Sequence, residues 1–141
     1  MTTSPQFPFE PAHSGLYRTP PALDLLQQAA ARLGIAYFRL DLRKVGDKRD
    51  FLGACARAFG FPASFGYNWD AFADSVQDLS WHPARGYLMH LQHASGFARA
   101  APHDYATAME ILGHAAAYWK ARATTFIVLI DDAQDLPLFT A

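Results

Sequence analysis

The sequence has a single cysteine, Cys55, so no disulfide can form within the chain. A lone thiol is typical of proteins in the reducing cytoplasm, and the sequence therefore predicts a cytoplasmic protein. Cys55 lies in an apolar stretch with helical spacing (residues 51–59). This setting favours a buried thiol over a nucleophile or a metal ligand.

An excess of positive charge and long apolar runs are also missing. The 12 Lys and Arg residues stand against 13 Asp and Glu, giving a net charge of -1, so the basic excess that nucleic-acid binding needs is absent. No apolar run approaches the ~20 residues that cross a bilayer. Residues 1–14 lack the basic segment followed by an apolar segment that marks a signal peptide. We expect neither a nucleic-acid partner nor a membrane association.

Motifs of catalysis are missing as well. The glycines are isolated, so there is no phosphate-binding loop, and no Ser-His-Asp order appears. The six histidines raise a zinc hypothesis that rests on His90 and His93, together with His82 or His103. A spacing of three residues at a strand end points the first two side chains to opposite faces, and no cysteine joins them. We expect no bound metal, no cofactor and no catalytic residues, and therefore not an enzyme.

What the chain does contain is enough apolar material for one packed domain. Its 141 residues are 51% hydrophobic and 14% aromatic. Residues 1–14 carry three prolines and no hydrophobic period, which predicts a flexible N-terminal arm. Residues 15–141 are expected to form a single domain.

Hydrophobic spacing and turn residues predict helices alternating with strands. We expect helices at residues 22–33, 47–59, 68–79, 94–100 and 103–122, and strands at residues 35–42, 86–91 and 126–130. This alternation predicts an α/β fold with a small parallel sheet packed by helices, in two layers or as an α/β/α sandwich. The sheet has three strands, or four if residues 15–18 join its edge. The tail after Asp131 is expected at the surface.

The most informative segment is acidic and spans residues 64–81. The chain has no Lys or Arg between Arg57 and Arg85, whereas Asp70, Asp74 and Asp78 recur there every four residues. On a helix these carboxylates lie along one side. The apolar residues that would anchor the opposite side to the core are Trp69, Phe72, Val76 and Leu79.

This acidic face is not explained by helix stability. Like charges four residues apart destabilise a helix by roughly 0.2–0.5 kcal/mol per pair, although Asp70 is favoured near the helix N-terminus and Asn68 can cap it. The plain interpretation is a solvated helix face, and the functional one is a negative projection that fits a positively charged pocket. Asp70 and Asp74 as a catalytic pair, as in glycoside hydrolysis, would need a cleft that a convex helix does not provide.

Residues 65–74 (FGYNWDAFAD) resemble an element of the barstar (barnase inhibitor) family, which reads aromatic-Gly-x-Asn-x-Asp-Ala-(Leu/Phe)-x-Asp. The flanking elements follow the family's order, so the resemblance covers about residues 35–130. It implies a sheet of three parallel strands packed by helices. It also implies a cytosolic inhibitor that plugs the active site of a guanyl-preferring microbial ribonuclease with an acidic helix and the loop before it.

The resemblance also implies which residues bind the partner. Asp74 matches the family's principal carboxylate, which takes the position of a phosphate, and Asp70 matches its second acidic contact. Gly66 and Asn68 match loop residues that meet the enzyme, although Asn68 is equally well explained as a helix cap. The other residues expected at this surface are Tyr67, Ala73, Gln77, Asp78 and Trp81.

Some positions depart from the family's pattern. Ser64 stands where the family's best-known member has a contacting tyrosine, and Ala73 replaces a tryptophan of that member. The acidic contact expected from the fourth helix falls near Ala117 or Tyr118. Two hypotheses about the partner therefore remain. The first is a basic, extracellular-type ribonuclease or related toxin bound by a monomeric inhibitor. The second is a basic protein that is not a ribonuclease, bound by an immunity or regulatory module.

Overall fold

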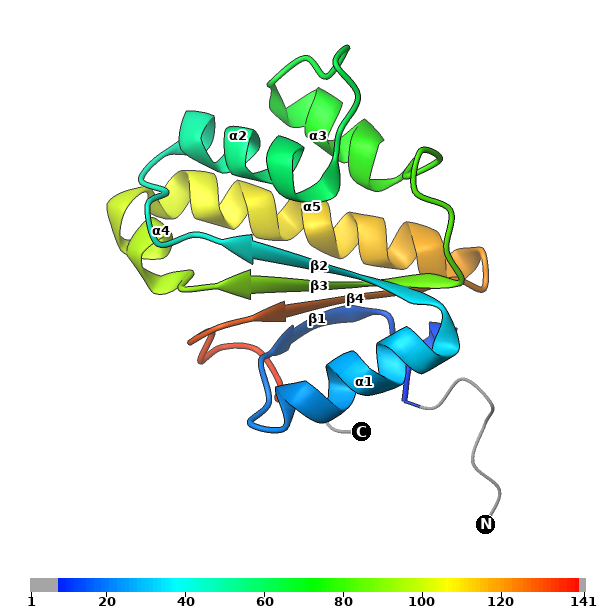
Figure 1. Ribbon diagram of the computed structural model, residues 1–141. Coiled ribbons are helices and arrows are strands. Elements are labelled where there is room, and N and C mark those ends of the chain that lie inside the picture. Colours follow the sequence, from blue (N-terminus) through cyan, green and yellow to red (C-terminus); the bar gives the residue numbers. More distant parts are fainter. Residues whose placement is uncertain (1–7, 140–141) are drawn as a thin grey trace.

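The fold is built on a four-stranded parallel sheet with the strand order β1-β4-β3-β2 (Figure 1). The structure, a computed structural model, describes residues 8–139. The strands are β1 (Gly15–Arg18), β2 (Ile35–Asp41), β3 (Gly86–Gln92) and β4 (Thr125–Ile130). The expected parallel α/β sheet is confirmed, and residues 15–18 join its edge as the fourth strand by pairing with β4.

Helices cover both faces of this sheet. The helices are α1 (Leu23–Leu33), α2 (Lys48–Phe59), α3 (Trp69–Val76), α4 (Ser95–Ala100) and α5 (Pro102–Ala121), and a short 3-10 turn, η1, spans Pro11–His13. Four of them, α2 to α5, lie on one face, whereas α1 lies on the other (Figure 1). The result is an α/β/α arrangement in which one helical layer is much thicker than the other.

Local sequence signals explain where the helices begin and end. The carboxylate of Asp47 accepts a hydrogen bond from the Asp50 amide at 2.8 Å and caps α2. This helix ends at Gly60 and α1 ends at Gly34, both in the left-handed conformation, with φ of 67° and 75°. Glycine adopts that conformation without steric strain, so both ends fall where the sequence predicts them.

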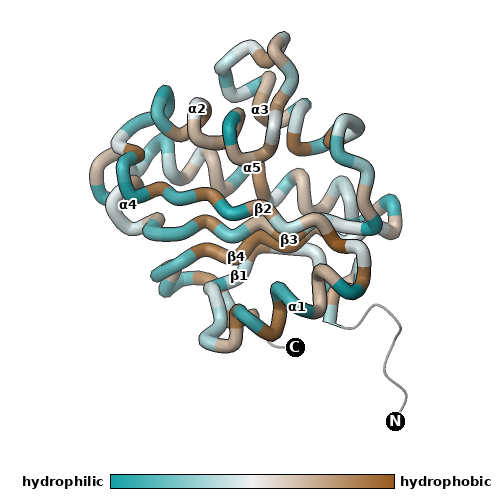
Figure 2. The backbone as a smooth tube through the Cα atoms, viewed as in Figure 1, coloured by the Kyte–Doolittle hydropathy of each residue, from teal (hydrophilic) through white to brown (hydrophobic). Residues whose placement is uncertain are grey.

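The core has two parts because the central strands are buried on both faces. Tyr87, Met89 and Leu91 of β3 pack toward α2–α5, whereas Leu88 packs toward α1. Hydrophobic residues accordingly follow most of β4, and the hydrophobic colour also runs through the middle of β3 (Figure 2). Cys55 is fully buried in the larger part, and burial raises the pKa of its thiol well above the ordinary value. The thiol is therefore protonated and unreactive at neutral pH, as expected.

The two ends of the described chain pack together beneath the sheet edge. Phe9 is fully buried and lies 6.3 Å from the ring of Phe139, which also meets Tyr17 edge-on at 5.0 Å. The Thr125 hydroxyl donates to the carbonyl of Phe9. Residues 8–14 therefore belong to the folded unit, and the rest of the expected arm lies outside the described residues. The expectation that the tail lies at the surface is wrong for Phe139, because its ring completes the smaller part of the core.

Both ring nitrogens of His90 are engaged inside the protein. Nε2 lies 2.8 Å from the Asp131 carboxylate, and Nδ1 lies 3.2 Å from the hydroxyl of Tyr37. Burial raises the pKa of Asp131. The hydrogen bonds that its carboxylate accepts, with that from His90 the largest of them, together outweigh burial, and the net shift of this pKa is downward. Within residues 8–139, no three His, Cys, Asp or Glu residues are grouped so that they could hold a metal ion. The helices of that part are also too short or too polar to cross a bilayer.

Candidate partner-binding surface

The start of α3 is locked by the loop before it. Asn68 caps the helix, because its side-chain oxygen accepts a hydrogen bond from the Ala71 amide at 2.8 Å. The side-chain amide of Asn68 also donates to the carbonyl of Gly66 at 3.2 Å. Between them, Tyr67 has a φ of 52°, in the left-handed region that is uncommon for residues other than glycine. Loop and helix are thus joined by two hydrogen bonds of the Asn68 side chain.

The inner side of α3 is anchored in the core as the sequence predicts. Phe72, Val76 and Leu79 are fully buried, and Trp69 is half-buried. The ring of Phe72 meets Phe51 of α2 edge-on at 5.4 Å between ring centroids. These contacts fix which side of α3 faces outward.

The helix is shorter than the expected residues 68–79. It ends at Val76, and the Asp78 amide donates to the carbonyl of Ser75 at 3.2 Å in the turn that follows. Leu79 adopts a left-handed φ of 51°, and this turn brings its side chain into the core. Asp70 and Asp74 therefore share the helix, whereas Asp78 lies on the turn beyond it, and the expectation of three carboxylates on one helix is wrong for Asp78.

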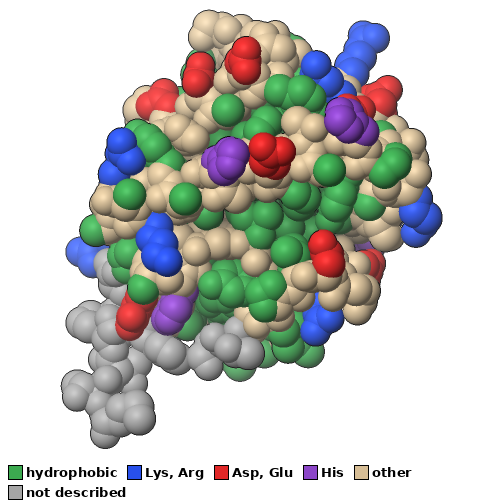
Figure 3. Space-filling model, turned by 180° about the vertical axis from the view of Figure 1, so that it is seen from behind, with side chains coloured by type: hydrophobic (Ala, Val, Ile, Leu, Met, Phe, Trp, Pro, Cys, Tyr) green, Lys and Arg blue, Asp and Glu red, His purple; other side chains and the backbone are tan. Residues whose placement is uncertain are grey.

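All three carboxylates face solvent without a cation beside them. Asp70, Asp74 and Asp78 are exposed, and among the residues described none forms an ion pair or a side-chain hydrogen bond. Seen from behind, acidic side chains gather at the end of the molecule that contains α3, and the Lys and Arg side chains at that end lie toward α2 (Figure 3). The surface is ready to accept hydrogen bonds from a cationic partner.

A small hollow adjoins the central carboxylate. It measures about 230 Å³ and lies between α3 and the preceding loop, and its lining includes Ser64, Asp74 and Asp78. Its floor includes Phe65, whose ring is buried under the loop. Sequence reasoning did not single out Phe65, although an aromatic residue next to Gly66 is part of the motif. The hollow can admit the end of one partner side chain beside Asp74.

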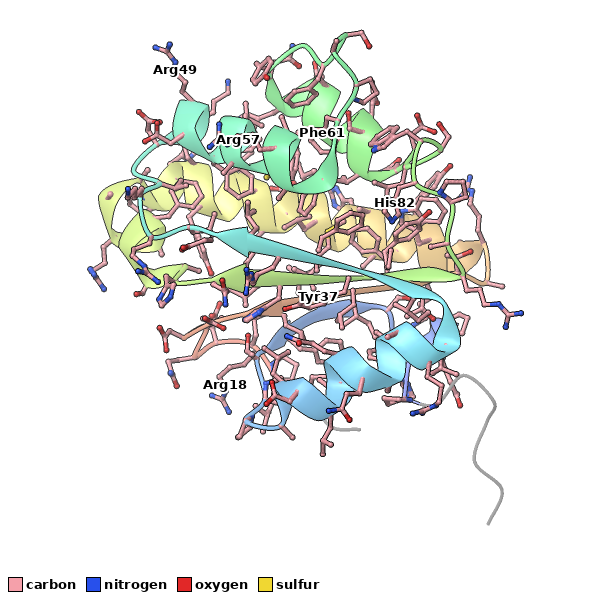
Figure 4. All side chains as sticks on the ribbon, viewed as in Figure 1. Arg18, Tyr37, Arg49, Arg57, Phe61 and His82 are labelled. Atoms are coloured by element: carbon pink, nitrogen blue, oxygen red, sulfur yellow. The ribbon has the colours of Figure 1, made fainter. Side chains whose placement is uncertain are left out.

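Two tryptophan side chains hold this surface in place. The indole N–H of Trp119 in α5 donates to the carbonyl of Val76 at 2.8 Å, where α3 ends. The indole N–H of Trp81 donates to the carbonyl of Phe59 at 3.0 Å, and its ring lies 5.8 Å from that of Phe61, which packs beneath the loop (Figure 4). Trp81, expected at the partner surface, thus lines the hollow while its polar atom is used internally.

The remaining residues expected at this surface differ in how exposed they are. Gly66 and Tyr67 are exposed, and the Tyr67 ring, 59% exposed, rests on Phe65 at 4.8 Å. Ala73 and Gln77 are half-buried. The guanidinium of Arg122, which directly follows α5, lies 3.5 Å from the centre of the Tyr118 ring. Near Ala117 and Tyr118, where the resemblance implies a further acidic contact, this chain therefore has an aromatic ring with a cation against it.

Replacing the cap tests how firmly α3 is fixed. We expect Asn68→Ala to lower the free energy of unfolding by about 1 kcal/mol, because the Ala71 amide loses its acceptor. Urea unfolding followed by circular dichroism measures the change. Asn68→Asp retains the acceptor and serves as the control. Equal stability of parent and alanine variant would contradict the capping role.

The fold and this surface together define a class: a small α/β protein with an exposed acidic helix that is anchored to the core and capped by the loop before it. Residues 35–131 match the family described as barstar (barnase inhibitor), and the chain belongs to that family. Members of the family are inhibitors rather than enzymes. A comparison with curated proteins found no match. Four parts of the described chain lie outside the matched residues: η1, β1, α1 and the packed tail.

Proposed function

We propose that this protein inhibits a barnase-like microbial ribonuclease by occluding its active site with α3 and the loop before it. It acts as a monomer in the cytoplasm, which suits a chain whose single cysteine is an unpaired thiol. The observation that carries the proposal is the exposed, unpaired state of Asp70 and Asp74 within the family's own binding element.

The chemistry of RNA cleavage explains why carboxylates suit this task. An enzyme that holds a phosphodiester needs Arg, Lys or His donors, and a carboxylate accepts the same donors through charge-assisted hydrogen bonds. Asp74 takes the central position beside the hollow, and Asp70 lies one helical turn earlier. The partner's cations would exchange water for these oxygens without first breaking an ion pair in the inhibitor.

Rigidity of the surface adds to affinity. Ordering a loop on binding opposes association, and a surface that is already ordered avoids that loss. Here the Asn68 cap, the buried Phe72 and the Trp119 hydrogen bond to Val76 hold α3 in place before any partner arrives. The protein therefore acts as a preformed plug.

Inhibition assays test the proposal directly. The protein is titrated against a panel of purified guanyl-preferring microbial ribonucleases that includes barnase, with RNA cleavage as the readout. We expect loss of activity at a 1:1 ratio for at least one enzyme, and competition by 3′-guanylate, which occupies the same active site. The mechanism of occlusion would be overturned if the protein inhibits no enzyme of the panel, or if it binds an enzyme without competing with 3′-guanylate.

Association with the inhibited enzyme is expected to depend strongly on salt. Complementary charges speed encounter, and screening shortens their reach from about 30 Å at 0.01 M ionic strength to about 3 Å at 1 M. We expect the association rate constant to fall by about tenfold or more across this range, whereas dissociation changes less. Stopped-flow fluorescence measures both rates. A salt-independent association rate would contradict steering by the acidic surface.

A second candidate is an immunity or regulatory module whose basic partner is not a ribonuclease. The region of Ala117 and Tyr118 favours it, because neither position has the acid that the resemblance implies and Arg122 packs on the Tyr118 ring there. Co-purification with toxins encoded nearby, followed by a ribonuclease assay on the captured partner, separates the two candidates. A partner that binds through Asp74 but does not cleave RNA would favour the second.

A further inference from the structure

A larger hollow of about 670 Å³ lies on the other side of the Tyr67 loop, between the end of β2 and α2. Four cationic side chains line it: Arg43, Lys44, Arg49 and Arg57. Arg49 and Arg57 both project from α2 (Figure 4). Five of the chain's 12 Lys and Arg residues fall between residues 43 and 57. The cations are thus concentrated in one stretch rather than spread along the chain.

The lining of this hollow has four cationic side chains and two carboxylates, so positive charge is in excess. Its two carboxylates are turned to backbone amides: Asp41 accepts from the Arg43 amide at 2.9 Å, and Asp50 from the Gly46 amide at 3.2 Å. In the part of the chain that the structure describes, the one ion pair at the hollow joins exposed Arg43 and Asp41 at 3.9 Å. A surface pair of that length contributes little.

A glycine in the middle of α2 keeps the floor of the hollow open. Gly53 lines the hollow, and a Cβ placed on it would come within 4 Å of one neighbouring atom, Nη1 of Arg57, at 3.4 Å. Glycine inside a helix is unfavourable relative to alanine, so its presence needs a reason. Here the missing side chain leaves room for a ligand next to the Arg57 guanidinium.

We propose that this hollow binds a small phosphorylated ligand of nucleotide size. Arg and Lys side chains are the usual donors to phosphate, and the hollow's volume lies within the range of small-ligand sites, about 300–1,000 Å³. Tyr67 lines the same hollow with an exposed ring on which a base can stack. The hollow shares Tyr67 with the surface proposed to meet the ribonuclease, whereas its four cations lie outside that surface, so phosphate binding can be tested independently of inhibition.

Two probes distinguish the phosphate from the base. GDP and inorganic pyrophosphate are titrated at constant ionic strength, and binding is followed by calorimetry and by amide chemical shifts. We expect saturable 1:1 binding of both, with shifts at residues 43–57 and at Tyr67. Arg57→Gln weakens both ligands about tenfold or more, because a charge-assisted hydrogen bond to phosphate is lost. Tyr67→Leu weakens GDP and leaves pyrophosphate unchanged, because only GDP has a base to stack.

A pair of glycine variants separates binding from folding. Gly53→Ala removes an unfavourable helical glycine but places a methyl group on the floor of the hollow, so we expect a higher thermal midpoint together with weaker GDP binding. Gly113→Ala is the matched control in the middle of α5, where an added Cβ meets nothing within 4 Å. It raises the thermal midpoint and leaves GDP binding unchanged.

Three results would overturn the proposal. The first is that neither probe binds in a saturable manner. The second is that Arg57→Gln binds GDP as well as the parent, or no worse than Arg99→Gln, a control at an exposed arginine of α4. The third is that neither probe binds while Arg57→Gln weakens ribonuclease inhibition, which would make the hollow a docking surface for an acidic partner segment.

Discussion

Asp74→Ala is expected to leave the fold intact and to abolish effective inhibition. The side chain is exposed and forms no hydrogen bond or ion pair among residues 8–139, so its removal changes the free energy of unfolding by no more than about 0.5 kcal/mol. In the complex, the partner's phosphate-binding cations would be left buried without a counter-charge. Truncating one partner of such a pair costs about 2–5 kcal/mol, which is about 30-fold to several thousand-fold in the inhibition constant.

Matched variants make this result specific to one position. Asp24→Ala changes the same charge at an exposed residue of α1, on the opposite face of the sheet, and is expected to inhibit as the parent does. Asp74→Asn keeps the shape and removes the charge, so it measures the electrostatic share. The proposed mechanism is wrong if Asp74→Ala inhibits as tightly as Asp24→Ala.

The parts of the fold that the sequence predicts are those determined by local chemistry. Gly34 and Gly60 end helices because each adopts a left-handed φ, and Asp47 and Asn68 begin helices because their side chains accept backbone hydrogen bonds. The continuous apolar run in β4 predicts a strand buried on both faces, and it is one. Each of these signals lies within a few residues of the feature that it determines.

The features that escaped prediction depend on contacts between distant residues. Helical spacing continues to Leu79, but the packing of its side chain into the core requires a turn after Val76. Phe139 packs on Phe9, 130 residues earlier in the chain, and neither position carries a local signal for this contact. Periodicity describes single elements, whereas these contacts depend on how the elements meet.

The candidate site was predictable in its residues but not in its shape. Residues 65–74 are contiguous, so the motif alone located the carboxylates. The hollow beside Asp74 and the hydrogen bond from Trp119 to Val76 join segments far apart in the chain. The basic hollow had a visible signal in the cations of residues 43–57, and Gly53 gave a second, but their common opening appears only in the folded protein.

Phe72→Ala is expected to have the opposite profile to Asp74→Ala. Phe72 is fully buried and packs against Phe51, Trp69 and Phe61, so truncation removes its burial and leaves a cavity at the base of α3. Such a change lowers the free energy of unfolding by about 3–5 kcal/mol. For a chain of this length, that corresponds to a fall in thermal midpoint of about 10–20 °C, measurable by calorimetry.

The two variants together separate the anchor of α3 from its acidic surface. Leu25→Ala, at an apolar residue that is 66% exposed, is the control for Phe72→Ala and is expected to change stability little. At a temperature where Phe72→Ala remains folded, its carboxylates are all present, so any weaker inhibition reports the loosened position of α3. Wild-type stability in Phe72→Ala would contradict the anchoring role, and full inhibition by a folded Phe72→Ala would show that the plug does not need to be rigid.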